Sequence, residues 1–201
     1  MFCSDPAALR VAAIIREERP DVLLTYPERQ SRYPHPDHLR VYEVSIRARE
    51  MASDASLEIE GLAPHLIPKV YFHILTVERI AALHEKFLQL GLESPFSPDW
   101  FESVVPDYLA TTKINITGYH EVRSRSLRAH ATQIDPASKN WLGLSDALSE
   151  QAYPSEDLFL AVAPDGYVLD AVETDLVAGP LWSCSAMVIG GDAGYRQPSH
   201  P

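Results

Sequence analysis

The sequence has little cysteine, no long apolar run and no cluster of basic residues, and each shortage excludes a class of protein. Its 201 residues include two cysteines, at positions 3 and 184, so neither a disulfide framework nor a thiolate metal cluster is available. No apolar stretch approaches the ~20 residues of a membrane helix, and the first residues do not resemble a secretion signal. The net charge of -11 opposes contact with a phosphate backbone. We therefore expect a cytoplasmic protein that binds neither nucleic acid nor membrane.

The residues that are present alternate between helical and strand patterns. Residues 4 to 18 have apolar residues at mostly helical spacing behind an N-cap at Ser4 or Asp5. DVLLTY, at 21 to 26, is a short apolar run between prolines, which is typical of a buried strand in a parallel sheet. Helical spacing resumes at residue 37 after a polar loop. Strands are further expected at 69–75 and 113–117, and helices at 77–91 and 118–134.

This alternation predicts an α/β domain, a Rossmann-like three-layer sandwich with a mostly parallel sheet. The pattern decays from Ala163 onward. We therefore divide the chain into a domain at residues 1–162 and a divergent segment at 163–201, whose last ten residues we expect to be mobile.

The stretch YPHPDH, at 33 to 38, gathers two of the eight histidines around an acid. It lies where a loop meets a helix, so His35 and His38 can both face the end of the preceding strand. Neutral imidazoles bind divalent metals, and a neighbouring carboxylate such as Asp37 can fix the ring tautomer. The alternative is that Asp37 only complements the helix dipole and both histidines are solvated.

YPHPDH followed by a helix resembles the second metal motif of the LmbE-like zinc deacetylases, the N-acetylglucosaminyl-phosphatidylinositol de-N-acetylase family. The segments TYPERQSRYPHPDHLRVYEVS, LHEKFLQLGLESPF and EVRSRSLRAHATQIDP, in this order, resemble its mycothiol S-conjugate amidase branch. EDLF, at 156 to 159, is similar to the end of that branch. The resemblance covers about residues 5 to 162.

The resemblance implies zinc-dependent cleavage of an amide on a glucosamine-type small molecule, such as a mycothiol S-conjugate, and so a role in detoxification. His38 matches a metal ligand, and Asp37 matches the carboxylate beside it. His35 matches the histidine that stabilises the oxyanion and protonates the leaving amine, with Tyr33 assisting at the same oxygen. Whether the chain forms a homo-oligomer is left open.

The sequence departs from the family at one important place. Family members begin with a strand ending in Ala-His-Pro-Asp-Asp-Glu, which supplies two metal ligands and the general base, and this chain contains no such motif. A catalytic zinc normally has three protein ligands and a water. His73 and His130 are candidates to replace the missing ligands, although a hydrogen-bonded structural histidine is the favoured interpretation of His73.

Other polar groups suggest weaker hypotheses. The helix matching that of His130 helps to line the substrate cleft in the family, so His130 and Arg123 are candidate substrate contacts, although a solvated helix face also explains Arg123, Arg125 and Arg128. The other four histidines are expected to be structural residues or surface residues. Ser124 and Ser126 lack the sharp turn of a nucleophile, and GGDAG lacks the lysine of a phosphate loop.

Three hypotheses follow for the chain as a whole. In the first, the gene product is longer and its start was placed too late. In the second, the chain is a catalytically incomplete remnant that binds without catalysis. In the third, a partner subunit supplies the missing strands. A metal phosphohydrolase is a further alternative on the bare motif, but such enzymes draw on several His and Asp clusters.

Overall fold

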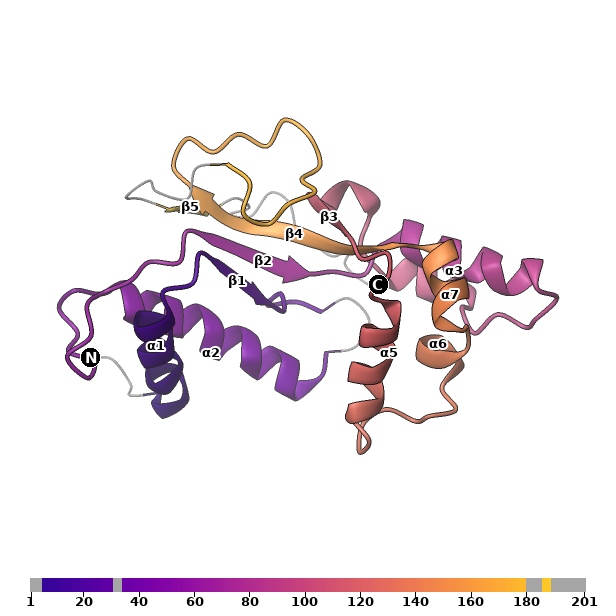
Figure 1. Cartoon of the computed structure of the whole chain (residues 1–201), viewed down its shortest axis with the longest axis horizontal. Coiled ribbons are helices and arrows are strands. Elements are labelled where there is room, and N and C mark those ends of the chain that lie inside the picture. Colours follow the sequence, from indigo (N-terminus) through magenta and orange to yellow (C-terminus); the bar gives the residue numbers. More distant parts are fainter. Residues whose placement is uncertain (1–4, 31–33, 180–185, 189–201) are drawn as a thin grey trace.

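The computed structural model describes residues 5–30, 34–179 and 186–188 (Figure 1). Five strands and seven α-helices alternate along these residues, with one short 3-10 helix. They are α1 (Pro6–Glu18), β1 (Val22–Thr25), α2 (Pro36–Ser53), β2 (Lys69–His73), α3 (Val77–Gln89), α4 (Pro98–Ser103), η1 (Asp107–Leu109), β3 (Thr112–Asn115), α5 (His120–Ala129), α6 (Lys139–Leu142), α7 (Asp146–Ala152), β4 (Ser155–Pro164) and β5 (Ala186–Val188).

The strands form one mixed sheet in the order β1-β2-β4-β3, and β5 pairs with β4. β1 and β2 are parallel neighbours joined through α2, whereas β4 is antiparallel to β2, β3 and β5. All described strands except β4 therefore run in one direction. The α/β class is confirmed, but the expected parallel pairing is limited to β1 with β2 because β4 enters the middle of the sheet in the opposite direction.

The first helices follow local signals in the sequence. Asp5 caps α1 by accepting hydrogen bonds from the amides of Ala7 and Ala8, and Pro6 occupies the first turn. β1 follows, as the apolar run predicts, but Leu24 is 55% exposed. The expectation of a fully buried strand is therefore wrong, because β1 lies at the edge of the described sheet and only β2 pairs with it.

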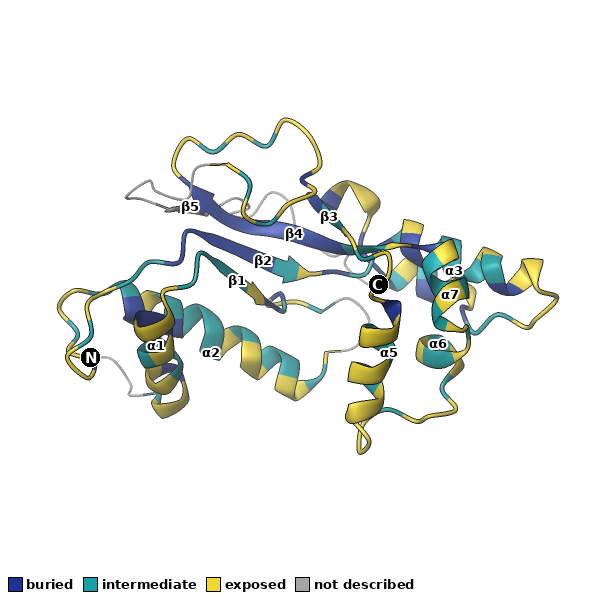
Figure 2. Cartoon of the chain, viewed as in Figure 1, coloured by how far each residue is buried: buried dark blue, intermediate teal, exposed yellow. Residues whose placement is uncertain are grey.

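Helices α1 and α2 pack together against one face of the sheet (Figures 1 and 2). Their contact is closed by alanines such as Ala8, Ala12 and Ala48, which are fully buried. Arg16 is buried beside them and donates hydrogen bonds to the carbonyls of four residues: Met51, Ala52, Asp54 and Leu62. Because the last carbonyls of a helix have no partner within it, Arg16 satisfies the end of α2 and fixes it to α1.

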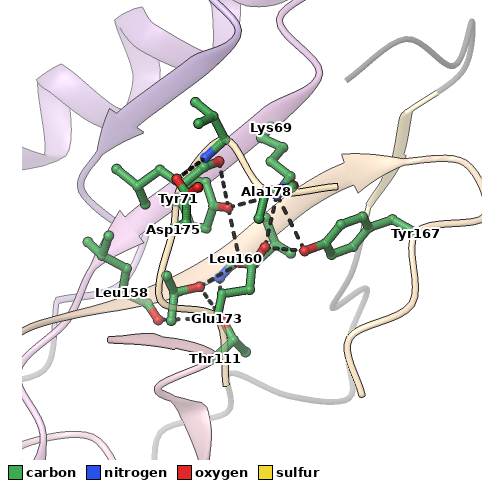
Figure 3. A network of polar contacts seen from close by, with 12 residues as sticks. Lys69, Tyr71, Thr111, Leu158, Leu160, Tyr167, Glu173, Asp175 and Ala178 are labelled. Atoms are coloured by element: carbon green, nitrogen blue, oxygen red, sulfur yellow. Dashed lines mark hydrogen bonds and ion pairs between the residues drawn. The ribbon is translucent and has the colours of Figure 1, made fainter. Parts of the chain in front are cut away.

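The opposite face of β2 and β4 is covered by residues 165–179, which we call the strap (Figure 3). Glu173 of the strap accepts hydrogen bonds from Lys69 Nζ at 2.9 Å, from Tyr71 OH at 3.0 Å and from Thr112 Oγ1 at 2.8 Å. Lys69 is fully buried and also donates to the carbonyl of Ala178. This ion pair and its hydrogen bonds therefore bind the strap to strands β2 and β3.

The structure differs from the sequence prediction at several further points. β4 was not predicted, and it continues to Pro164, past the expected boundary at residue 162. α5 ends at Ala129, earlier than the expected 134, because the backbone turns at His130. The division at residue 162 stays a prediction, and the expected mobile tail lies outside the described residues. Among the described helices, none has the length and apolarity needed to cross a bilayer.

The buried ion pair between Lys69 and Glu173 leads to a prediction about stability. Lys69→Met leaves the Glu173 carboxylate without its cation, so we expect the free energy of unfolding to fall by about 3 to 5 kcal/mol. Urea unfolding followed by circular dichroism measures this change. Lys139→Met is the matched control, because Lys139 pairs with Glu93 at 3.6 Å while both side chains are mostly exposed. The control should cost less than about 1 kcal/mol, and equal losses would contradict the structure.

Candidate active site

The two motif histidines begin helix α2 at the carboxyl end of β1. His35 is the N-cap of α2, in extended conformation, and Pro36 fills the first helical position. Its Nδ1 accepts the backbone N–H of Asp37 at 3.1 Å. Because Nδ1 is an acceptor, the ring hydrogen of neutral His35 is on Nε2. The capping bond therefore fixes both the position and the tautomer of His35.

His38 lies one turn later and stacks on Tyr26, the residue that follows β1. The two ring centroids are 4.0 Å apart and the planes differ by 7°. Its Nδ1 donates to Gln30 Oε1 at 3.1 Å, and its ring centroid is 5.3 Å from that of His35. Burial, and then the neighbouring His35, lower the pKa of His38. His38 is therefore biased toward the neutral form, with Nε2 carrying the lone pair.

The remaining residues of the motif occupy less enclosed positions. Asp37 has an exposed side chain, and its Oδ2 lies 3.7 Å from His35 Nδ1. The hydrogen-bond partner found at His38 is the amide of Gln30, which the sequence analysis did not identify. Tyr33 lies outside the described residues. The structure thus brings His35, Asp37 and His38 together and adds Gln30 and Tyr26 to the group.

A second polar cluster forms around Glu156, near the start of β4. Its carboxylate accepts hydrogen bonds from Arg79 at 2.5 and 3.2 Å, from Arg123 Nε at 3.1 Å and from the His73 ring at 3.2 Å. Burial raises the pKa of Glu156, but the hydrogen bonds and charges of His73 and Arg79 outweigh burial and hold it far below its ordinary value. Glu156 is therefore ionised throughout the physiological range.

The other candidate histidines make their described contacts outside the motif. His73 lies at the end of β2 and bonds to Glu156, in agreement with the interpretation as a hydrogen-bonded histidine. Its charge still acts on His38. His130 is exposed at the C-cap of α5 and is not in the helix where we expected it. The described contacts do not bring His130 to His35 or His38.

The described residues do not make a zinc site. Within residues 5–30, 34–179 and 186–188, no three His, Cys, Asp or Glu side chains converge on a point where they could hold a metal ion. A catalytic zinc needs three protein ligands. His38 offers a neutral nitrogen of suitable chemistry, but its described hydrogen-bond partner is an amide and not a further ligand.

Comparisons with known proteins identify the family. No family model matches the chain. A 1D-myo-inositol 2-acetamido-2-deoxy-alpha-D-glucopyranoside deacetylase from Kineococcus radiotolerans is 34% identical over 189 residues, covering 89% of this chain and 52% of that enzyme. A mycothiol S-conjugate amidase from Streptomyces coelicolor is 34% identical over 163 residues, covering 78% of this chain and 55% of that enzyme. The chain belongs to the LmbE-like family.

The family resemblance predicted from the sequence is confirmed. This LmbE-like chain spans between half and two thirds of the length of these two curated relatives. A solved structure supports the fold alone: the conserved protein TT1542 from Thermus thermophilus has a TM-score of 0.50 and 16% identity, covering 84% of this chain and 63% of that one.

From the Glu156 cluster we predict how the free energy of unfolding of this LmbE-like chain changes at acidic pH. We expect Glu156→Gln to lower the free energy of unfolding by about 3 kcal/mol at pH 7, because two arginines lose their carboxylate partner. Because the pKa of Glu156 is lower in the folded protein than its unfolded value of 4.5, the ionised carboxylate stabilises the protein fully above pH 4.5. This stabilisation is lost as pH falls toward the folded pKa. The difference between wild type and variant should therefore shrink below pH 4.5.

Urea unfolding at pH 7 and pH 3 measures this effect. Glu121→Gln is the control, because it makes the same change at an exposed carboxylate in the first turn of α5. It should alter stability by less than about 0.5 kcal/mol at both pH values. A Glu156→Gln difference that stays constant with pH would argue against a depressed pKa.

Proposed function

We propose that this chain carries the histidine half of an amide hydrolase that acts on a glucosamine-type small molecule, such as a mycothiol S-conjugate. The observation that carries the proposal is the pairing of His35 and His38 at the carboxyl end of β1, with His38 held against Tyr26. Ligand sites of α/β sheets gather at this edge. The relatives named as a deacetylase and an amidase support the reaction class.

His35 is proposed to act at the oxygen and amine of the scissile bond. Its neutral ring has the hydrogen on Nε2, so it can donate a hydrogen bond to a carbonyl oxygen that gains negative charge. When the ring is protonated, Asp37 Oδ2 at 3.7 Å from Nδ1 provides a counter-charge. The protonated ring can then release its Nε2 proton to the leaving amine. Tyr33 is proposed to assist at the same oxygen.

Zinc is the cofactor that we propose for the complete site, with His38 as one ligand. Tautomer and charge both suit this role, because Nδ1 donates to Gln30 and burial lowers the pKa of His38. The described residues do not supply two further ligands. A complete zinc site therefore requires ligands beyond those that the structure describes.

Substrate contacts are proposed at Arg123, whose guanidinium joins the Glu156 cluster, and at His130 on the end of α5. We also propose that the protein is cytoplasmic and acts in detoxification, as the resemblance implies. The boundary of the LmbE-like domain at residue 162 is part of this proposal.

The second candidate function is a binding module without catalysis. The observation that favours it is the absence of a three-ligand metal group in the described residues. Such a module would keep the surface that recognises the sugar conjugate while lacking the metal centre. Zinc content and amine release separate the two functions.

The test measures primary amine released from a mycothiol S-conjugate and from an N-acetylglucosaminyl inositol by the purified full chain with added zinc. We expect His35→Asn to lower kcat/KM by about 10² to 10⁴, because it removes the proposed proton donor. Asn is a good N-cap, so α2 should keep its start. His38→Asn should remove both activity and stoichiometric zinc, which elemental analysis measures.

His84→Asn is the control, because His84 bonds to Ser94 and is not part of the histidine pair. It should retain the wild-type rate. If the wild-type chain binds no zinc and releases no amine from either substrate, the hydrolase is excluded for this chain. Saturable binding of the conjugates in that case would support the binding module.

A further inference from the structure

A pocket lies beside Arg123, on the side of α5 that faces α6 and α7. Its volume is about 320 Å³, and its walls come from α5 and from the turn that joins α6 to α7. The residues that matter for its chemistry are His120, Arg123, Arg128, Trp141 and Asp146. Figure 1 shows α5 next to α6 and α7, at the end of the sheet where β2 and β3 finish.

His120 is the first sign that the pocket takes a polar group. The residue is 6% exposed, and its Nε2 is buried without a hydrogen-bond partner among the described residues. A buried polar nitrogen left unpaired costs about 1 to 3 kcal/mol. Burial lowers the pKa of His120, so the ring is neutral at physiological pH and can present an N–H. A polar group that reached this nitrogen would remove that cost.

Arg123 is the second sign. Its Nε donates to Glu156, and no described hydrogen bond uses its two terminal NH₂ groups. Glu156 is already shared with the buried Arg79, so one carboxylate serves two guanidinium groups. The terminal nitrogens of an arginine form a planar pair of donors that matches two oxygens of a carboxylate or phosphate.

Two of the three charged residues that line the pocket are arginines. Arg123 and Arg128 line it from α5, and Asp146 is the one carboxylate among its lining residues. Asp146 acts on Arg123 by its charge alone, without a described ion pair. Arg128 is exposed. Trp141 is 40% exposed and adds an apolar face to the wall.

The shape of the pocket is fixed by the backbone at its far wall. Gly143 ends α6, and a Cβ built there would lie 2.4 Å from the carbonyl oxygen of Lys139. A side chain at this position would therefore displace the wall. Glycine allows α6 to turn tightly next to α5.

We propose that this pocket binds the carboxylate or phosphate group of a small molecule between Arg123, Arg128 and His120. Arg123 is also a proposed substrate contact, but holding an anion in this pocket requires neither a metal nor cleavage of an amide. A failure of the hydrolase proposal therefore leaves this proposal standing, and the reverse also holds.

The test is a ¹H–¹⁵N NMR titration of the full chain with sodium phosphate and, separately, with sodium acetate at constant ionic strength. We expect saturable shifts at the Trp141 indole and at the Nε–H groups of Arg123 and Arg128. Arg123→Gln and Arg128→Gln should each raise the Kd at least about tenfold, because each removes a charged hydrogen-bond donor.

Arg125→Gln is the matched control, because Arg125 is exposed on the same helix and does not line the pocket. It should change the Kd by less than about twofold, since exposed charges are screened by salt. If Arg123→Gln does not fold, the change in Kd of the Arg128→Gln variant tests the proposal. Saturation by phosphate alone or by acetate alone supports the proposal and identifies the group. Shifts that do not saturate, or equal losses in all three variants, would overturn it.

Discussion

The carboxylate of Glu156 is the constraint on which this end of the molecule depends. It accepts hydrogen bonds from His73 at the end of β2, from Arg79 on α3 and from Arg123 on α5. β4 is antiparallel to β2, so the first residues of β4 lie beside the last residues of β2. An antiparallel strand thereby places an anion at the sheet edge where parallel strands present their carboxyl ends. The ionised Glu156 in turn joins α3 to α5, and α5 lines the pocket beside Arg123.

Features encoded by short segments were predictable from the sequence. The caps of α1 and α2 and the apolar spacing of α3 are set by residues within one or two turns, and the structure has these helices within a few residues of the expected bounds. β4 was missed, although its apolar run between Pro154 and Pro164 is typical of a central strand. The exposure of Leu24 was unpredictable for a different reason: burial of a strand depends on its neighbours, and β1 has only β2 beside it among the described strands.

Some residues of the candidate site were likewise predictable from the sequence, and others were not. His35 and His38 were predictable because their positions follow from the start of one helix. Gln30 was not, because it lies eight positions before His38 and outside the helix that positions the histidines. The Glu156 contact with His73 joins residues 83 positions apart, and only the sheet register brings them together. Helical spacing correctly placed Arg123 on α5 but could not reveal its carboxylate partner or the pocket beside it.

The two clusters also explain how His73, His38 and His35 differ in chemistry. His73 shares its Nε2 with the ionised Glu156 carboxylate, so Nδ1 is the unprotonated nitrogen of its neutral ring. His38 donates its Nδ1 hydrogen to the amide of Gln30 and stacks on Tyr26, so Nε2 is the unprotonated nitrogen of its neutral ring. His35 has its Nδ1 committed to the cap of α2, so protonating that nitrogen exchanges the capping bond for the charge of Asp37. Because the positive end of the helix dipole opposes a cation there, Asp37 is the group that makes a proton-donor role for His35 physically consistent.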